Sequence, residues 1–219
     1  MDFLLYFNFD NFYPFMSEIE TYENIKASDK DIIYGLTILG PHQCGKSSLV
    51  QKFIHDREEK ENETSNSVAT KKYTIKILQE GEKSVYLRIF IPSWSDDAAR
   101  MRFLTVAGSE YIILCFSSND RLGFSEVSTV IKDTLLKKKK DTAKIILLKT
   151  KKDLEQKSGE DLVTDEEISE LAKEVNAFKV FKCSISTGEG ISDAFDAAVM
   201  DILKKEKVNK KPWYQCLCC

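Results

Sequence analysis

The chain has 219 residues, 31% of them charged and 42% hydrophobic, and its formal net charge is −3. This length suits one ordinary domain with extensions, and it allows a sizeable hydrophobic core. The slightly acidic balance argues against nucleic acid as the main partner, and no apolar run approaches the ~20 residues that span a bilayer.

Residues 1–30 are predicted to form an extension outside the domain. Their first half, MDFLLYFNFDNFYPF, contains seven aromatic side chains. It lacks the basic start, the long apolar core and the small-residue cleavage site of a signal peptide. We expect this segment to dock its aromatic side chains on the domain or on a partner.

From Ile32 onward, short apolar runs alternate with amphipathic segments. Strands are predicted at Ile32–Leu39, Tyr73–Leu78, Val85–Ile91, Ile112–Phe116, Lys144–Leu148 and Phe178–Cys183. Helices are predicted at Ser47–Asp56, Ser125–Lys138, Thr164–Val175 and Ser192–Glu206. The segment QEGEKS fits a hairpin turn between the second and third strands, and Thr164 with Glu167 fits a capping box. Residues 60–69 are predicted to be a mobile polar loop.

This alternation predicts an α/β fold, with a six-stranded, mostly parallel sheet in a domain over residues 31–206. The solidly apolar strands Ile112–Phe116 and Lys144–Leu148 indicate a sheet that is covered on both faces. Residues 207–219 are expected to form a flexible basic tail.

The segment GPHQCGKSS, residues 40–48, follows the first predicted strand and fulfils the phosphate-loop (Walker A) pattern. Successive backbone N–H groups and the positive end of the next helix would face one point and form an anion site. Lys46 is expected to reach the terminal phosphates, and the Ser47 hydroxyl to ligate Mg²⁺. The predicted binding residues of this loop are Gly40, His42, Gln43, Cys44, Gly45, Lys46, Ser47 and Ser48.

A second motif, TKKDL, follows the strand predicted at Lys144–Leu148. The Asp153 carboxylate is suited to accept two hydrogen bonds from guanine, from its ring N–H and its exocyclic amine, a pair that adenine lacks. Lys151 is expected to lay its stem against the base, Ser184 to steady Asp153, and the Ile185 amide to donate to the guanine carbonyl. On its own, TKKDL also fits a charged helix start.

Taken in order, these motifs resemble the Ras superfamily of small GTPases, and the Rab branch most closely. The guanine motifs of that family are usually Asn-Lys-x-Asp and Ser-Ala-Lys, where this chain has Thr150-Lys151-Lys152-Asp153 and Ser184-Ile185-Ser186. Residues 112–124, IILCFSSNDRLGF, also resemble the fourth strand and following loop of the family, so the resemblance spans about residues 32–206.

The resemblance implies the small-GTPase fold, a sheet flanked by about five helices, with GTP or GDP and Mg²⁺ as ligands. The Thr150 hydroxyl is expected to tie the guanine motif to the phosphate loop in place of Asn. Ser186 in place of Lys removes a second contact near the base. Both departures predict looser nucleotide binding.

The family carries Asp-x-x-Gly-Gln after its third strand. The Asp holds Mg²⁺ through a water molecule, the Gly amide senses the γ-phosphate, and the Gln orients the attacking water. This chain has Ile91-Pro92-Ser93-Trp94-Ser95 there, and the bulk of His42 crowds the phosphate loop. We therefore expect weak or absent GTP hydrolysis and assign no catalytic residue. The Thr of the other switch stays open between Thr64 or Ser65 and Ala69 or Thr70.

The last residues, KEKVNKKPWYQCLCC, resemble the lipidated tail of Rab-like proteins, with Cys218 and Cys219 as geranylgeranyl acceptors. Residues 216–219 also fit a C-a-a-X box loosely. Two lipid chains anchor stably where one gives only marginal membrane residence, and the lysines add attraction to anionic lipid.

The leading interpretation is therefore a membrane-anchored, Rab-like guanine-nucleotide-binding protein of vesicle traffic, on the cytoplasmic face of an endomembrane with a cytosolic pool. The resemblance implies effectors, exchange factors, a GDP-dissociation inhibitor and a prenyltransferase as partners. A nucleotide-indifferent scaffold that keeps the fold and the tail is the main alternative. A small P-loop kinase ranks last, because no arginine-rich lid is evident.

Overall fold

The computed structural model describes residues 31–55, 63–66, 70–80, 83–135, 143–155 and 162–208. The predicted extension over residues 1–30 and the lipidated cysteines lie outside these residues. The strands are β1 (Ile32–Leu39), β2 (Glu63–Asn66), β3 (Thr70–Glu80), β4 (Lys83–Pro92), β5 (Tyr111–Ser117), β6 (Lys144–Thr150) and β7 (Lys179–Lys182). The α-helices of the described residues are α2 (Lys46–His55), α3 (Ala99–Ala107), α4 (Arg121–Leu135), α5 (Asp165–Glu174) and α6 (Asp193–Val208).

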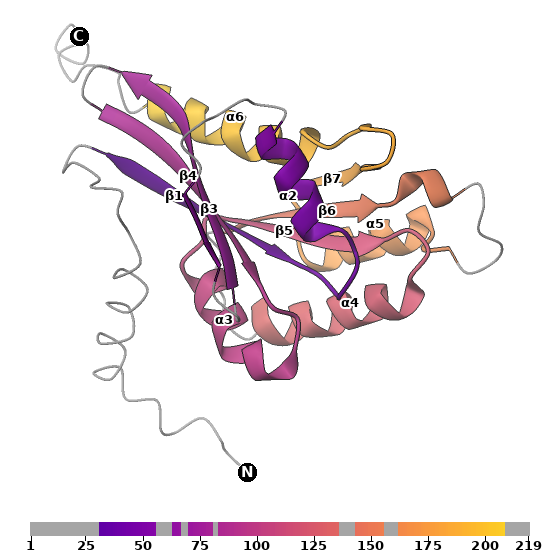
Figure 1. The fold of residues 1–219 in the computed structure, drawn as a ribbon. Helices are drawn as coiled ribbons and strands as arrows, with labels where there is room; N and C mark the ends of the chain where they lie inside the picture. The colour runs from indigo at the N-terminus through magenta and orange to yellow at the C-terminus, as the bar shows by residue number, and fades with distance from the viewer. Residues whose placement is uncertain are drawn as a thin grey trace, which may run out of the picture.

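The strands form one sheet in the order β2-β3-β4-β1-β5-β6-β7 (Figure 1). The strands from β4 to β7 in this order run parallel, whereas β3 is antiparallel to β4 and β2 is antiparallel to β3. All six predicted strands are present and the predicted fold class is confirmed. The hairpin between the second and third predicted strands is also confirmed.

Two elements differ from the sequence-based prediction. The strand β2 lies inside residues 60–69, which we expected to be a loop, and it pairs with β3 through its backbone. Helix α3 has no counterpart among the predicted helix ranges. Its sequence, ARMRFLTVA, places only Arg102, Thr105 and Val106 in the buried class, so it lacks a broad apolar stripe.

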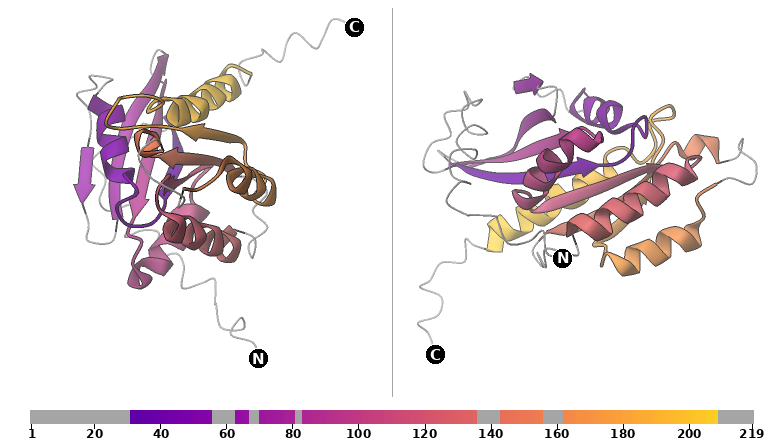
Figure 2. Two further views of the ribbon diagram at one scale, coloured as in Figure 1. Left: turned by 90° about the vertical axis from the view of Figure 1, so that its right-hand side faces the viewer. Right: turned by 90° about the horizontal axis from the view of Figure 1, so that it is seen from below.

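Helices cover both faces of the sheet, as the apolar central strands predict (Figures 1 and 2). On one face, α2 and α6 pack on the sheet, and Phe53 of α2 stacks on Phe195 of α6 with ring centroids 4.0 Å apart. On the other face, Val106, Val127 and Ile168 come from α3, α4 and α5 and share one cluster. The sheet is therefore packed on both faces, and its strand ends carry the loops.

Helix starts follow local capping rules. The Thr164 side chain accepts from the Glu167 amide, and the Glu167 carboxylate accepts from the Thr164 amide, so the predicted capping box is confirmed. Helix α4 begins four residues earlier than predicted, because the Asp120 carboxylate accepts from the Gly123 amide (2.9 Å). No helix among the described residues is long and apolar enough to cross a membrane.

Candidate functional site

The phosphate loop connects the carboxyl end of β1 to the first turn of α2, at the sheet edge where open α/β proteins bind ligands. Gly40 allows a close approach, since a Cβ there would lie 2.2 Å from the Cys115 carbonyl oxygen. Gly45 has a φ of +96°, which side-chain-bearing residues rarely adopt. Gly40 therefore lets the loop lie directly against β5, and Gly45 adopts the turn that leads into α2.

The Lys46 ammonium lies on the inner side of this loop. It donates to the carbonyl oxygens of Gly40 (2.7 Å) and Pro41 (2.6 Å), and it lies 3.5 Å from Cys44 Sγ. Burial raises the pKa of the Cys44 thiol, so this sulfur stays neutral next to the ammonium. The positive charge of Lys46 is therefore positioned but not neutralised by the loop.

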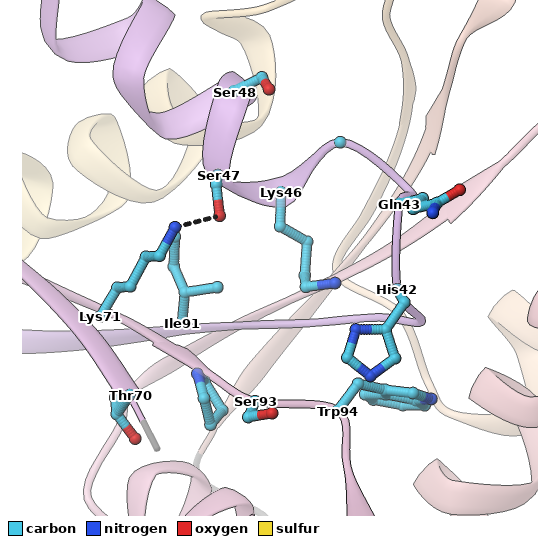
Figure 3. A pocket seen from close by; sticks show the side chains of 12 residues that line it. His42, Gln43, Lys46, Ser47, Ser48, Thr70, Lys71, Ile91, Ser93 and Trp94 are labelled. Atoms are coloured by element: carbon cyan, nitrogen blue, oxygen red, sulfur yellow. Dashed lines mark hydrogen bonds between the residues drawn. The ribbon is translucent and has the colours of Figure 1, made fainter. Parts of the chain in front are cut away.

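A pocket of about 400 Å³ opens beside this ammonium (Figure 3). Its lining residues are His42, Gln43, Gly45, Lys46, Ser47, Ser48, Thr70, Lys71, Ile91, Pro92, Ser93 and Trp94. Two ammonium groups belong to this set, and none of its members carries a carboxylate. Such a lining favours an anionic ligand, and together with the loop amides it matches a phosphate chain.

The predicted guanine motif lies beside this loop, at the end of β6. The Thr150 hydroxyl is fully buried and donates to the Cys44 carbonyl oxygen at 2.6 Å. It also lies 3.2 Å from the Phe116 carbonyl oxygen. The predicted link between Thr150 and the phosphate loop is therefore present in the structure.

Asp153 lies just beyond, in the 3₁₀ turn η4 (Lys152–Leu154). The Ser184 hydroxyl, which follows β7, donates to Asp153 Oδ1 at 2.5 Å and also contacts Ser186 Oγ at 2.9 Å. Lys151 adopts a left-handed conformation with φ of 56°, and its carbonyl accepts from Ser118 (2.7 Å). Two neighbouring strand ends thus hold the carboxylate that is predicted to read the base.

The remaining predicted residue, Ile185, connects the two halves of the site. A Cβ built on Gly45 would lie 3.1 Å from Ile185 Cδ1, so this side chain packs beside the phosphate loop. The side chains of His42, Gln43 and Ser48 are exposed at the mouth of the loop, and Ser186 is exposed on the base side. The predicted residues of the three motifs are therefore brought together at one edge of the sheet.

The segment after β4 is held by side chains that the sequence analysis did not single out. The Arg102 guanidinium, buried in α3, donates to the carbonyl oxygens of Ser93 (3.1 Å) and Ser95 (2.5 Å). It also lies 5.3 Å from the centre of the Trp94 ring. The indole N–H of Trp94 donates to Glu126 Oε2 of α4 at 3.0 Å. Side chains of α3 and α4 therefore hold this segment in place.

Comparison with known proteins gives the family. Residues 35–204 match the Ras family. This chain belongs to the Ras family of small GTPases. It is 27% identical to the GTP-binding protein RHO2 of Saccharomyces cerevisiae over 187 residues, which cover 82% of this chain and 95% of the relative. It is 30% identical to the GTP-binding protein Rit1 of Mus musculus over 174 residues, which cover 80% of this chain and 76% of the relative.

The names of these relatives refine one prediction. The superfamily inferred from the three motifs is confirmed, whereas the relatives carry Rho and Rit names rather than Rab names. The Rab branch, which the sequence motifs and the tail resemble most, therefore stays a prediction.

A Ras-family site is expected to hold Mg²⁺ through the loop Ser and an Asp after the third family strand. In this chain the corresponding side chains are Ser47 and Ile91 (Figure 3). The Ser47 hydroxyl accepts a hydrogen bond from the Lys71 ammonium at 3.3 Å. Mg²⁺ prefers hard oxygen ligands, and an adjacent ammonium repels it. The residues present at this Ras-family site therefore do not fit a divalent cation.

The Thr of the other switch of this Ras-family chain remains an open prediction. Thr64 and Ser65 lie in β2, whose side chains are outside the description, and Ala69 is also outside the described residues. Thr70 begins β3 and lines the pocket.

Sequence reasoning missed two functional candidates in this Ras-family site, Lys71 and Arg102. A lysine in a strand and an arginine in a short helix are most often solvated surface groups, so neither carries a local signal. Counting residues along the hairpin does not find Lys71 either, because the register of the β3–β4 ladder shifts between Lys76 and Leu78.

Proposed function

We propose that this Ras-family chain is a guanine-nucleotide-binding protein that hydrolyses GTP slowly or not at all. The observation that carries the proposal is the joint placement of two sites. Thr150 ties the guanine motif to the phosphate loop through the Cys44 carbonyl, and Ser184 holds the Asp153 carboxylate beside it. A ligand with both a diphosphate and a guanine base satisfies the two sites at once.

Slow hydrolysis follows from the segment after β4. Ser93, Trp94 and Ser95 occupy the stretch where the family places its γ-phosphate sensor and its water-positioning Gln. The Ser95 side chain is too short to orient a water over the γ-phosphate. The Trp94 ring lines the pocket next to His42 and adds bulk to the phosphate loop there (Figure 3). None of the described residues that line the pocket carries a carboxylate that could accept a proton from water.

A second candidate function is a nucleotide-indifferent scaffold. It is favoured by one observation, that Arg102 and Glu126 hold the Ser93–Ser95 segment through side-chain contacts within the protein. Because these contacts already order the segment, a bound γ-phosphate, which normally orders the switch segments, would change its conformation little.

One experiment tests the proposal against the scaffold. The full chain is purified without added nucleotide and denatured, and the released nucleotide is identified by chromatography. We expect GDP or GTP. Phosphate release from added GTP is then followed for hours, and we expect a rate at least about tenfold below the roughly 4 × 10⁻⁴ s⁻¹ of unassisted Ras.

The Lys46→Met variant is the blank for that assay, since it lacks the phosphate-binding ammonium. Release of no guanine nucleotide, with no binding of added GDP, would contradict guanine-nucleotide binding and favour the scaffold. Turnover as fast as that of an unassisted family member would contradict the slow-hydrolysis half of the proposal.

Membrane attachment and a Rab-like role in vesicle traffic, at the cytoplasmic face of an endomembrane, belong to the same proposal. Helix α6 leads into residues 209–219, where basic residues precede the terminal cysteines. A lipid pair on Cys218 and Cys219, with nearby lysines, provides stable anchoring. Prenyltransferase, GDP-dissociation inhibitor, exchange factors and effectors would then be its partners.

Replacing both terminal cysteines tests this anchor. In cell fractionation we expect the native chain mainly with membranes, and the Cys218→Ser/Cys219→Ser variant in the soluble fraction. Cys216→Ser is the matched control and is expected to stay with membranes. Membrane association that survives the double replacement would contradict the dual-lipid anchor, and loss in the control alone would indicate a C-a-a-X box instead.

A further inference from the structure

Lys71 brings a second positive charge to the phosphate pocket from a separate part of the fold. It lies on β3, whereas Lys46 and Ser47 lie at the start of α2. The Lys71 side chain crosses to the helix, and its ammonium donates to Ser47 Oγ at 3.3 Å (Figure 3). The two lysines thus approach the pocket from β3 and from the phosphate loop.

The partners of Lys71 leave its charge available to a ligand. Its hydrogen-bond partner Ser47 is neutral, and the pocket lining contains no carboxylate. The residue opposite Lys71 in the β3–β4 ladder is Ile91, which is also uncharged and 5% exposed. A lysine ammonium has three donors, so one bond to Ser47 leaves two for phosphate oxygens.

An exposed lysine–serine bond contributes little to stability by itself, because both groups are well solvated. The importance of this bond therefore lies in where it holds the Lys71 ammonium. It places a monovalent cation next to the hydroxyl that would otherwise ligate Mg²⁺, and on the side where the family's carboxylate is replaced by Ile91. The Lys71 ammonium thus lies beside the Ser47 hydroxyl, and an apolar side chain stands where the family has its carboxylate.

We propose that Lys71 takes the place of Mg²⁺ in this site, so that the chain binds guanine nucleotide without a divalent cation. Its ammonium supplies the counter-charge to the terminal phosphates on the side opposite Lys46, and the Ser47 hydroxyl donates to the same phosphates. This inference rests on the proposed guanine-nucleotide binding and adds a specific ionic requirement to it.

Calorimetric titration with GDP tests the inference on the nucleotide-stripped full chain, once with excess Mg²⁺ and once with excess EDTA. We expect the two affinities of the native chain to agree within about threefold. The Lys71→Ala variant is expected to bind GDP roughly tenfold to a hundredfold more weakly in EDTA, as for loss of charge-assisted hydrogen bonds. Lys71→Arg, which keeps the charge, should recover part of this loss.

Two further variants sharpen the test. Lys72→Ala removes the same charge from the next residue of β3, whose side chain lies on the other face of the sheet, and should leave GDP affinity unchanged. Lys71→Asp places a carboxylate beside Ser47, and Mg²⁺ should then strengthen GDP binding. Thermal unfolding of each variant establishes that its fold is retained.

The possible failures are distinguishable. Native chain that binds GDP well with Mg²⁺ and at least about tenfold more weakly in EDTA overturns the role of Lys71 while leaving guanine-nucleotide binding intact. An unchanged affinity of Lys71→Ala in EDTA overturns it as well. Absence of GDP binding under both conditions overturns the proposed function, and this inference with it.

Discussion

Replacing Asp153 with alanine is expected to lower the affinity for GDP roughly a hundredfold to ten-thousandfold. The carboxylate is predicted to accept two hydrogen bonds from the base, and charge-assisted bonds of this kind contribute about 1.5–3 kcal/mol each. Ser184 donates to Oδ1 of this carboxylate and so holds it in one orientation. Calorimetric titration of the full chain with GDP measures the effect.

Selectivity provides a second readout for the same variant. Affinity for ADP, which lacks the guanine donor pair, should be weak in the native chain and unchanged in Asp153→Ala. Lys152→Ala is the matched control, since the Lys152 ammonium pairs with Glu189 at the surface. Such exposed pairs contribute little, so this control should bind GDP normally. A GDP affinity of Asp153→Ala equal to that of the native chain would contradict the base-reading role.

The second large effect is expected for Lys46→Met, which keeps most of the side-chain stem and removes the ammonium. We expect GDP affinity to fall roughly a hundredfold to a thousandfold, because at least two charge-assisted contacts to phosphate oxygens are lost. The binding of guanosine, which has no phosphate, should not change. Titration of the same preparation with GDP and with guanosine separates the phosphate contacts from the base contacts.

A matched control lies on the same helix. Lys52 is in the last turn of α2, away from the phosphate loop, and Lys52→Met should leave GDP affinity near the native value. The Lys46 variant also leaves the Gly40 and Pro41 carbonyls without their ammonium donor, so thermal unfolding is measured alongside. GDP affinity within about threefold of native in a folded Lys46→Met protein would argue against this phosphate site.

The parts of the fold that were predictable are those with a strong local pattern. The strands β5 and β6 are buried on both faces and therefore have continuous apolar sequences. Helix α5 begins with a capping box that can be recognised from Thr164 and Glu167 alone. By contrast, β2 joins the sheet through backbone hydrogen bonds in a polar segment, and nothing in its sequence distinguishes it from a loop.

The site, like the fold, has parts that were predictable from the sequence and parts that were not. The phosphate loop and the guanine motif are short, contiguous and directly downstream of apolar strands, so their place at one sheet edge follows from the order of the elements. The contacts that hold residues 93–95 in place do not follow from the order of the elements along the chain. They come from Arg102 and Glu126, on two different helices, and they exist only because both helices pack against the same face of the sheet.

The sequence by itself determined the Ras-family architecture, and it predicted the anion-binding loop and the replacement of the family's catalytic stretch at residues 91–95. Only the tertiary structure decided which lysine of β3 enters the pocket. The β3–β4 ladder shifts its register between Lys76 and Leu78, which places Lys71 opposite Ile91. Without this irregularity, counting from the hairpin would place Lys72 there. Because strand side chains alternate between faces, a shift of one residue decides which ammonium reaches Ser47.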